Sequence, residues 1–352
     1  MSSNVHNETD VKTTSGVVRG QTIQVLNTNV YQFLGIPYAE PPVGALRFAK
    51  PQPIEKPLEG IIDATKFGNG CMQKESGFTG MSSPSNLSED CLVLNIWTPN
   101  VRNKDQLSET PALKPVMFWI HGGGLSWGSS DMYGGGPLAT YDVVFVSINY
   151  RLAHFGFLYG DREDAPGNQG FYDQLLALKW VRENIHAFGG DRDEITIFGE
   201  SAGSWSVSAH ILSPLSKGLF KRAIMQSGAQ LFNKDRDMIT KSEALKEGKE
   251  LAKDLGCSDS EDWLQFLRNV DPKELVAKTK PSTRPVFGTE FLPLSAQKAF
   301  EITSLLNWAS VSVKRCALAG VKPIPNTKGK SIMCAVRDIS SSHLKISANA
   351  LH

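Results

Sequence analysis

Short apolar runs separated by polar, glycine-rich or proline-rich segments dominate the first two hundred residues. Val116–Ile120 is a continuous apolar run, as expected of a strand that is buried on both faces, and Val143–Ile148 is a further apolar strand. Gly170–Asn184 is long enough for a helix, and another β-branched and aromatic run follows at Ile195–Phe198. Earlier strands are expected at Gly16–Gly20, Val25–Val30, Tyr31–Gly35 and Ser88–Trp97, and a fixed loop at the proline-dense segment Ile36–Gly44. This order of strands and helices predicts an α/β fold.

The run Ile195–Phe198 leads into a G-x-S-x-G pattern, Gly199-Glu200-Ser201-Ala202-Gly203, and then into a helix-compatible segment, Ser204–Leu212. Strand, sharp turn and helix in this order are the context of a nucleophile elbow, which lifts a serine hydroxyl over the edge of the sheet. We expect a Cβ on Gly199 or Gly203 to collide with the neighbouring strand and helix. The pattern alone occurs by chance about 0.1 times in a chain of this length, so an ordinary serine-bearing turn is the alternative.

A second motif, His121-Gly122-Gly123-Gly124, follows the run Val116–Ile120. Three glycines after a buried strand allow backbone N–H groups to converge, as they do in an oxyanion hole. The alternative is a flexible glycine turn. Because the strand ends of an α/β sheet are where such folds hold ligands, we expect this motif to lie beside Ser201.

Composition excludes some classes of function. The chain has 352 residues, 41% of them apolar, and a net charge of +1, which gives no reason to expect nucleic acid or an anionic membrane as a partner. Its sequence contains no apolar run long enough for a transmembrane segment, and Met1–Ser15 lacks the apolar core of a signal peptide. The polar N-terminus argues for a cytoplasmic product. The sequons at Asn7–Thr9 and Asn86–Ser88, and the pair Cys71 and Cys91, argue for a glycoprotein outside the cell, so the compartment stays open.

Several longer blocks of the sequence resemble the type-B carboxylesterase/cholinesterase family. The similarity covers about residues 15 to 304, and the blocks that carry it are Ser88–Asn95, Asn149–Phe157, Gly167–Gln174, Trp180–Asp191 and Phe198–Gly203. The resemblance implies an α/β-hydrolase fold, with a large mixed, mainly parallel sheet flanked by helices.

The same resemblance implies the roles of individual residues. Ser201 would be the acyl-forming nucleophile, and the N–H groups of Gly123, Gly124 and Ala202 would form the oxyanion hole. Glu200, beside the nucleophile, would tune the local field rather than accept the serine proton. Cys71 and Cys91 flank a Gly/Ser-rich stretch and would form a disulfide around a flexible loop.

The sequence also departs from the family. Met81 stands where choline-binding members carry a tryptophan, so a cation–π site for a quaternary ammonium is not expected. Cys257 matches one half of a second family disulfide whose other half is missing, which leaves either a free thiol or a buried, apolar cysteine. None of the other upstream histidines lies where the family places its catalytic base; these are His154, His186 and His210.

The acid and the histidine of a catalytic triad are missing from the matching region. Such hydrolases carry them after the serine, and the family-like sequence stops near Ser304, so we expect a C-terminally truncated domain over residues 1–304. Residues 305–352 contain seven lysines and arginines against one aspartate and are expected to be a divergent, basic, disordered tail. Asp338 and His343 are only five residues apart, and we do not expect them to complete a triad.

These observations favour a carboxylic ester hydrolase that acts through an acyl-enzyme at Ser201 on a small-molecule ester, without cofactor or metal. With its acid and histidine missing, this chain is expected to be inactive or weak. The alternative is a non-catalytic, cholinesterase-like binding or adhesion protein, although Ser201 and the glycine run are intact. The shorter hormone-sensitive-lipase-like family shares H-G-G-G but lacks the cysteine loop, and we reject it.

Overall fold

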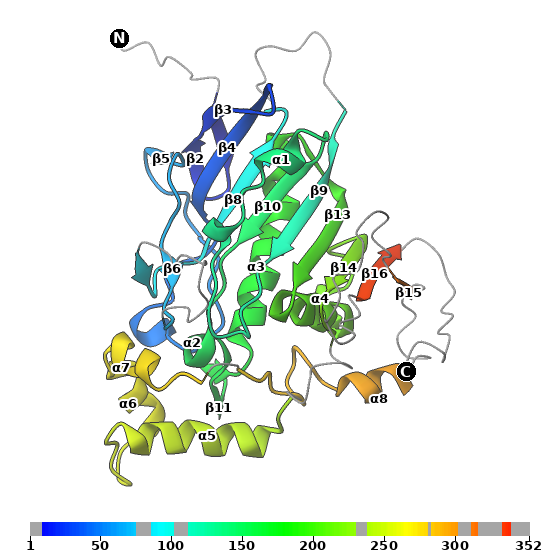
Figure 1. Cartoon of the computed structure of the whole chain (residues 1–352). Helices are drawn as coiled ribbons and strands as arrows, with labels where there is room; N and C mark the ends of the chain where they lie inside the picture. Colours follow the sequence, from blue (N-terminus) through cyan, green and yellow to red (C-terminus); the bar gives the residue numbers. More distant parts are fainter. Residues whose placement is uncertain are drawn as a thin grey trace, which may run out of the picture.

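The computed structural model describes residues 9–74, 86–101, 112–229, 238–280, 283–301, 311–315 and 333–338. Within them, a sheet of nine strands forms the centre of the molecule (Figure 1), in the spatial order β15-β16-β14-β13-β9-β10-β8-β4-β3. The strands are β3 (Gln21–Val25), β4 (Thr28–Pro37), β8 (Val93–Thr98), β9 (Lys114–Ile120), β10 (Val144–Ile148), β13 (Gly190–Glu200), β14 (Arg222–Gln226), β15 (Val311–Arg315) and β16 (Met333–Asp338).

The sheet is mixed. Its central strands β10, β9, β13 and β14 are parallel, while β8, β4 and β3 on one side and β16 and β15 on the other join by antiparallel pairing. Parallel strands require crossover connections, and the long helix between β10 and β13 supplies one. Small additional sheets are formed by β1 (Asp10–Thr13), β2 (Gly16–Arg19) and β5 (Ile61–Asp63), by β6 (Gly70–Cys71) and β7 (Leu87–Ser88), and by β11 (Tyr159–Arg162) and β12 (Ala165–Pro166).

Helices cover the sheet and its lower end in Figure 1. They are α1 (Gly136–Ala139), α2 (Ala153–Phe157), α3 (Gln169–Asn184), α4 (Ala202–Leu212), α5 (Lys241–Asp254), α6 (Trp263–Asn269), α7 (Pro272–Ala277) and α8 (Ala296–Glu301). Helices α5, α6 and α7 gather beside α2 around a separate apolar cluster. In the described part of the chain, no helix is both long and apolar enough to cross a lipid bilayer.

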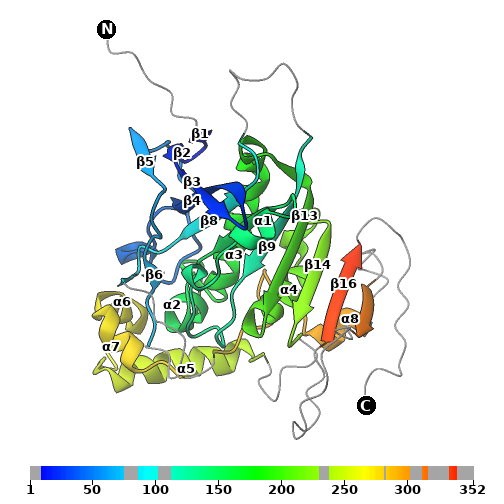
Figure 2. The same cartoon turned by 45° about the horizontal axis from the view of Figure 1, so that its top comes forward.

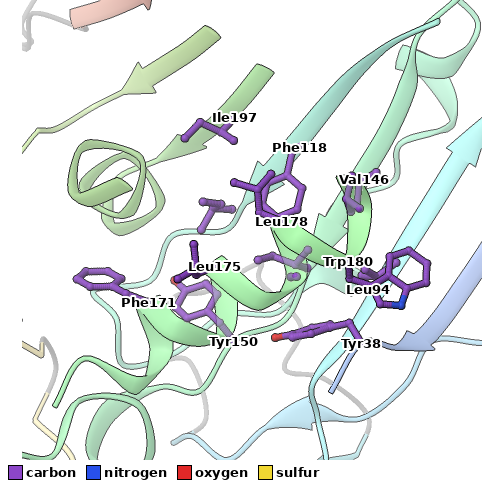
Figure 3. Packing of buried hydrophobic residues seen from close by; sticks show 14 of the residues in the cluster. Tyr38, Leu94, Phe118, Val146, Tyr150, Phe171, Leu175, Leu178, Trp180 and Ile197 are labelled. Atoms are coloured by element: carbon purple, nitrogen blue, oxygen red, sulfur yellow. The ribbon is translucent and has the colours of Figure 1, made fainter. Parts of the chain in front are cut away.

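The main core lies between α3 and one face of the sheet. Leu175 and Leu178 of α3 share a buried cluster with Phe118 of β9, Val146 of β10 and Ile197 of β13 (Figure 3). Burying one such side chain contributes roughly 1.5–3 kcal/mol, so this layer fixes α3 against the central strands.

The opposite face of the sheet carries a second cluster. Trp119 and Phe198 directly follow Phe118 and Ile197 in sequence, and they pack with Phe145 and with Ala139 of α1. Successive residues of a strand point to opposite faces, which explains why β9 is apolar at every position from Val116 to Ile120. The expectation that this strand is buried on both faces is therefore confirmed.

The predicted strand Val25–Val30 is wrong. Leu26 and Asn27 have φ values of 48° and 63° and form the turn of a hairpin between β3 and β4. Two successive positive φ angles match the right-handed twist of the paired strands. Leu26 gives no sequence signal for such a turn, whereas Asn27 is a residue type that tolerates positive φ.

Two strands of the segment beyond residue 304 extend the sheet. β16 pairs antiparallel with β14, and β15 pairs antiparallel with β16 (Figure 2). The domain junction at residue 304, and the disorder expected of the tail outside these two strands, stay predictions.

Candidate active site

Ser201 occupies a sharp turn between β13 and α4. Its φ and ψ angles are 55° and −118°, a region that residues with a side chain rarely adopt. The surroundings hold it there, because the Ser201 N–H donates to the Gln226 carbonyl oxygen at 2.9 Å and the Ser201 carbonyl accepts from the Trp205 N–H at 3.0 Å. The side chain is half-buried at the carboxyl end of the strand.

The two glycines around Ser201 are required by close backbone packing. A Cβ on Gly199 would lie 2.6 Å from the Ile120 carbonyl oxygen and 2.6 Å from the carbonyl carbon of Gly203. A Cβ on Gly203 would come even closer to the same Ile120 oxygen. The predicted collision with neighbouring strand and helix is confirmed at both positions.

The glycine run after β9 lies beside this turn. β9 and β13 are parallel neighbours with Ile120 opposite Gly199, so the segments that follow the two strands leave the sheet together. A Cβ on Gly122 would lie 3.3 Å from the Cβ of Ser201 and 2.7 Å from the Glu200 carbonyl oxygen. The two motifs that the sequence keeps far apart are therefore in contact.

Three backbone donors near Ser201 are available. Among the described residues, no acceptor is present for the N–H groups of Gly123, Gly124 and Ala202. Gly123 and Gly124 have φ values of 105° and 63°, in the region of positive φ that favours glycine. The Gly123 carbonyl accepts from the N–H groups of Ser126 and Trp127, both at 3.0 Å, which closes the turn. Free N–H groups of this kind can stabilise a negative charge on an oxygen.

Glu200, directly before Ser201, adds a negative charge at the end of β13. Its side chain is exposed, and Tyr133 is close enough for that charge to act on it. Burial first, and then the Glu200 carboxylate, raise the pKa of the Tyr133 hydroxyl. Tyr133 packs on Trp119 with ring centroids 4.9 Å apart. This neighbourhood could not be predicted from the sequence, because Tyr133 lies in an irregular segment outside both motifs.

His210 is a buried packing residue. Nδ1 lies 2.8 Å from the Ser216 hydroxyl and Nε2 lies 3.1 Å from the Gln174 side-chain oxygen. Burial lowers the pKa of this imidazole to about 3. The expectation that His210 packs rather than catalyses agrees with these contacts.

No described histidine hydrogen-bonds the Ser201 hydroxyl. His154 Nε2 lies 3.4 Å from the Lys278 carbonyl oxygen, and His186 is exposed on a short turn after α3. Asp338 ends β16 opposite Arg222, whereas His343 and Met81 lie outside the described residues. The predicted absence of a base and acid beside Ser201 stays a prediction.

The predicted cysteine pairing is confirmed where the structure describes it. Cys71 and Cys91 form a disulfide, with Cα atoms 5.0 Å apart. Cys257 is a free, half-exposed thiol, and its pKa is raised by desolvation and by nearby acidic side chains, Glu261 first. Asn86 is exposed, and its glycosylation stays a prediction.

Comparison with known proteins decides the family. A family model described as the carboxylesterase family matches residues 7–312. The chain belongs to the carboxylesterase family. The α/β-hydrolase fold of that family is consistent with the mixed sheet and its flanking helices.

Curated relatives in the carboxylesterase family include enzymes with different printed names. The chain is 46% identical to an acetylcholinesterase of Leptinotarsa decemlineata over 71% of its own length and 42% of the relative's. It is 46% identical to a cholinesterase of Mus musculus over 77% and 46%, and 49% identical to the pyrethroid hydrolase Ces2e of Rattus norvegicus over 62% and 39%. The chain thus spans less than half the length of the curated relatives that it matches.

Proposed function

We propose that this chain carries the nucleophile and oxyanion-hole part of a serine carboxylic ester hydrolase. Ser201 is the nucleophile, and the N–H groups of Gly123, Gly124 and Ala202 stabilise the oxyanion. The main support for the proposal is the proximity of Gly122 to Ser201. A Cβ added to Gly122 would lie only 3.3 Å from the Cβ of Ser201, so the glycine run lies beside the serine.

The reaction needs two displacements at the ester carbonyl. Ser201 Oγ bonds to the carbonyl carbon, the bond to the alcohol oxygen breaks, and the proton of the serine hydroxyl leaves with the alcohol. Water then adds to the acyl-serine and releases the carboxylic acid, which restores the hydroxyl. In both steps negative charge develops on the carbonyl oxygen, where the free N–H groups would bind it. Glu200 sets the field at the site without taking the proton.

Turnover by this chain is expected to be weak. A serine hydroxyl is a poor nucleophile until a base removes its proton, and among the described residues no histidine reaches it. An oxyanion hole and a binding site without a complete triad retain roughly 10³–10⁴-fold acceleration over water in serine proteases. We therefore expect Ser201 to react slowly with esters rather than not at all.

The test is reaction of the purified chain with a fluorophosphonate and with p-nitrophenyl acetate. The expected result is a phosphonyl adduct on Ser201 and slow ester turnover, both lost in Ser201→Ala. Ser204→Ala is the matched control, because Ser204 lies one turn along α4 with its hydroxyl bonded to the Gly228 carbonyl. No adduct on Ser201 would contradict the proposal and favour the non-catalytic binding protein. Turnover at the level of the full-length relatives would contradict the expectation of an absent base.

A preference for choline esters is not proposed. Met81 replaces the tryptophan expected for quaternary ammonium binding, although it lies outside the described residues. The expected result is that acetylthiocholine reacts no faster than a neutral thioester of similar size. A clear preference for acetylthiocholine would overturn this part of the proposal.

A further inference from the structure

His121 is buried directly beneath the glycine run. The residue is 1% exposed, and its ring stacks on Tyr150, with centroids 4.4 Å apart and an interplanar angle of 21°. The Tyr150 hydroxyl donates to the His121 carbonyl oxygen at 2.8 Å, so the same tyrosine holds both the ring and the backbone. His121 Nδ1 lies 2.8 Å from the carbonyl oxygen of Gly122.

These contacts fix the tautomer of His121. A carbonyl oxygen only accepts, so Nδ1 must carry the proton and donate it to Gly122. Nε2 is buried and has no partner among the described residues. Adding a proton to Nε2 would bury a charge and an unpaired donor, which is why desolvation lowers the pKa of this ring to about 4. Above that pH the ring is neutral, and its single N–H group, on Nδ1, donates to the Gly122 carbonyl oxygen.

The direction of the Gly122 carbonyl decides the direction of the next N–H. All peptide bonds in the described residues are trans, and in a planar trans peptide the C=O and N–H groups point in opposite directions. The Gly122 carbonyl is held toward the His121 ring, so the Gly123 N–H points away from it. Glycines on both sides of this peptide allow it to rotate, which would carry the carbonyl oxygen to the place of the donor.

We propose that His121 is a positioning residue that locks the Gly122–Gly123 peptide in the orientation that presents the Gly123 N–H to the oxyanion. This inference rests on the proposed function, since it assigns the donor a role at Ser201. The absence of a side chain at Gly128 leaves room for the His121 ring in this position. A Cβ on Gly128 would lie 2.5 Å from His121 Nδ1 and would displace the ring.

The experiment compares His121→Phe with His121→Asn in the full chain. Phenylalanine keeps the stacking on Tyr150 and removes the donor, whereas the asparagine amide restores a donor near the position of Nδ1. His210→Phe is the control for losing a buried histidine elsewhere, because His210 lies on α4 and contacts Ser216 and Gln174. The first readout is the Gly123 amide signal in protein labelled with [¹⁵N]glycine, with the Gly199 signal reporting that the elbow is folded.

In His121→Phe the Gly123 signal is expected to broaden or double as the peptide samples both orientations, and in His121→Asn and His210→Phe it stays single. The second readout is the rate of phosphonate labelling of Ser201. We expect a drop of about 10- to 100-fold in His121→Phe, since losing one oxyanion donor costs on the order of 10²–10³ in rate. His121→Asn should recover the rate to within about threefold of the parent chain.

An unchanged Gly123 signal in His121→Phe, or one disturbed equally in His210→Phe, overturns the inference. So does a labelling rate that falls equally in His121→Asn and His121→Phe. If the parent chain takes no phosphonate at Ser201, the proposed function fails, and the Gly123 signal alone still decides whether His121 holds the peptide.

Discussion

The carbonyl oxygen of Ile120 occupies the place where a side chain on Gly203 would begin. Ile120 ends β9, and Gly203 lies in the first turn of α4, so the helix that follows Ser201 sits directly on the neighbouring strand. This contact brings the turn at Ser201 close to the glycine run that continues from Ile120. The geometry of the site thus depends on the absence of one methyl group.

Gly203→Ala should strongly destabilise the protein. The added Cβ would lie well inside 3.0 Å of a backbone oxygen, which cannot move aside without shifting β9 or α4. Overpacking of this kind typically costs about 1–3 kcal/mol, and a backbone obstacle favours the upper end. Urea unfolding followed by circular dichroism measures it. Gly134→Ala is the matched control, since a Cβ there meets no atom within 4 Å, and equal stability of the two variants would refute the packing argument.

Replacing Ser201 with glycine should relieve backbone strain. The φ and ψ angles of 55° and −118° are open to glycine but costly for a residue with a Cβ. We expect Ser201→Gly to be more stable than Ser201→Ala by about 1 kcal/mol, after the greater chain entropy of glycine is subtracted. Both variants lack the hydroxyl, so the comparison isolates the backbone. A Ser201→Ala protein that is as stable as Ser201→Gly would show that the turn is unstrained.

Removing one partner of the buried ion pair between Arg151 and Asp173 should strongly lower the free energy of unfolding. Asp173 accepts from the Arg151 backbone N–H, Nε and Nη2 at 2.7–2.9 Å, and both side chains are almost fully buried. Asp173→Asn would leave the guanidinium buried without its counter-charge, at a cost of about 3–5 kcal/mol.

A surface pair provides the control for that measurement. Arg182 and Asp193 also lie 2.9 Å apart, but Asp193 is 74% exposed. Asp193→Asn should change the free energy of unfolding by less than about 1 kcal/mol. Similar losses in the two variants would show that burial does not decide the strength of these pairs.

Stability should fall as the pH drops from 7 to 5. Burial lowers the pKa of His121 to about 4 and that of His210 to about 3, against an ordinary value of 6.5. Unfolded chains therefore bind protons in this range while the folded protein does not, and each histidine costs the folded state about 2 kcal/mol at pH 5. Carboxylates with lowered pKa values contribute to the loss of stability mainly below pH 4.5. Unfolding curves at pH 7 and 5 test this, and His210→Gln should remove the part of the loss that His210 contributes, about 2 kcal/mol. A stability that is flat with pH would contradict it.

The features that could be predicted from the sequence are those where packing admits few residue types. Gly199 and Gly203 were predictable because a strand-to-helix turn against a neighbouring strand has no space for a Cβ. The strands β9 and β10 were predictable because both of their faces are covered and their residues are therefore mostly apolar. The turn at Leu26 and Asn27 was missed because leucine is not a turn-forming residue type and the segment Val25–Val30 begins and ends with a β-branched residue. Contacts between distant segments, such as the Gln226 carbonyl with the Ser201 N–H or the Tyr150 hydroxyl with the His121 carbonyl, are set by tertiary packing and leave no local pattern.

Mass spectrometry of the fluorophosphonate-treated chain can show whether Ser201 is the nucleophile. We expect an adduct on the peptide that contains Ser201, absent from Ser201→Ala and retained in Ser204→Ala. Failure to form that adduct, or an adduct that persists in Ser201→Ala, would contradict the assignment of Ser201 as the nucleophile beside an oxyanion hole.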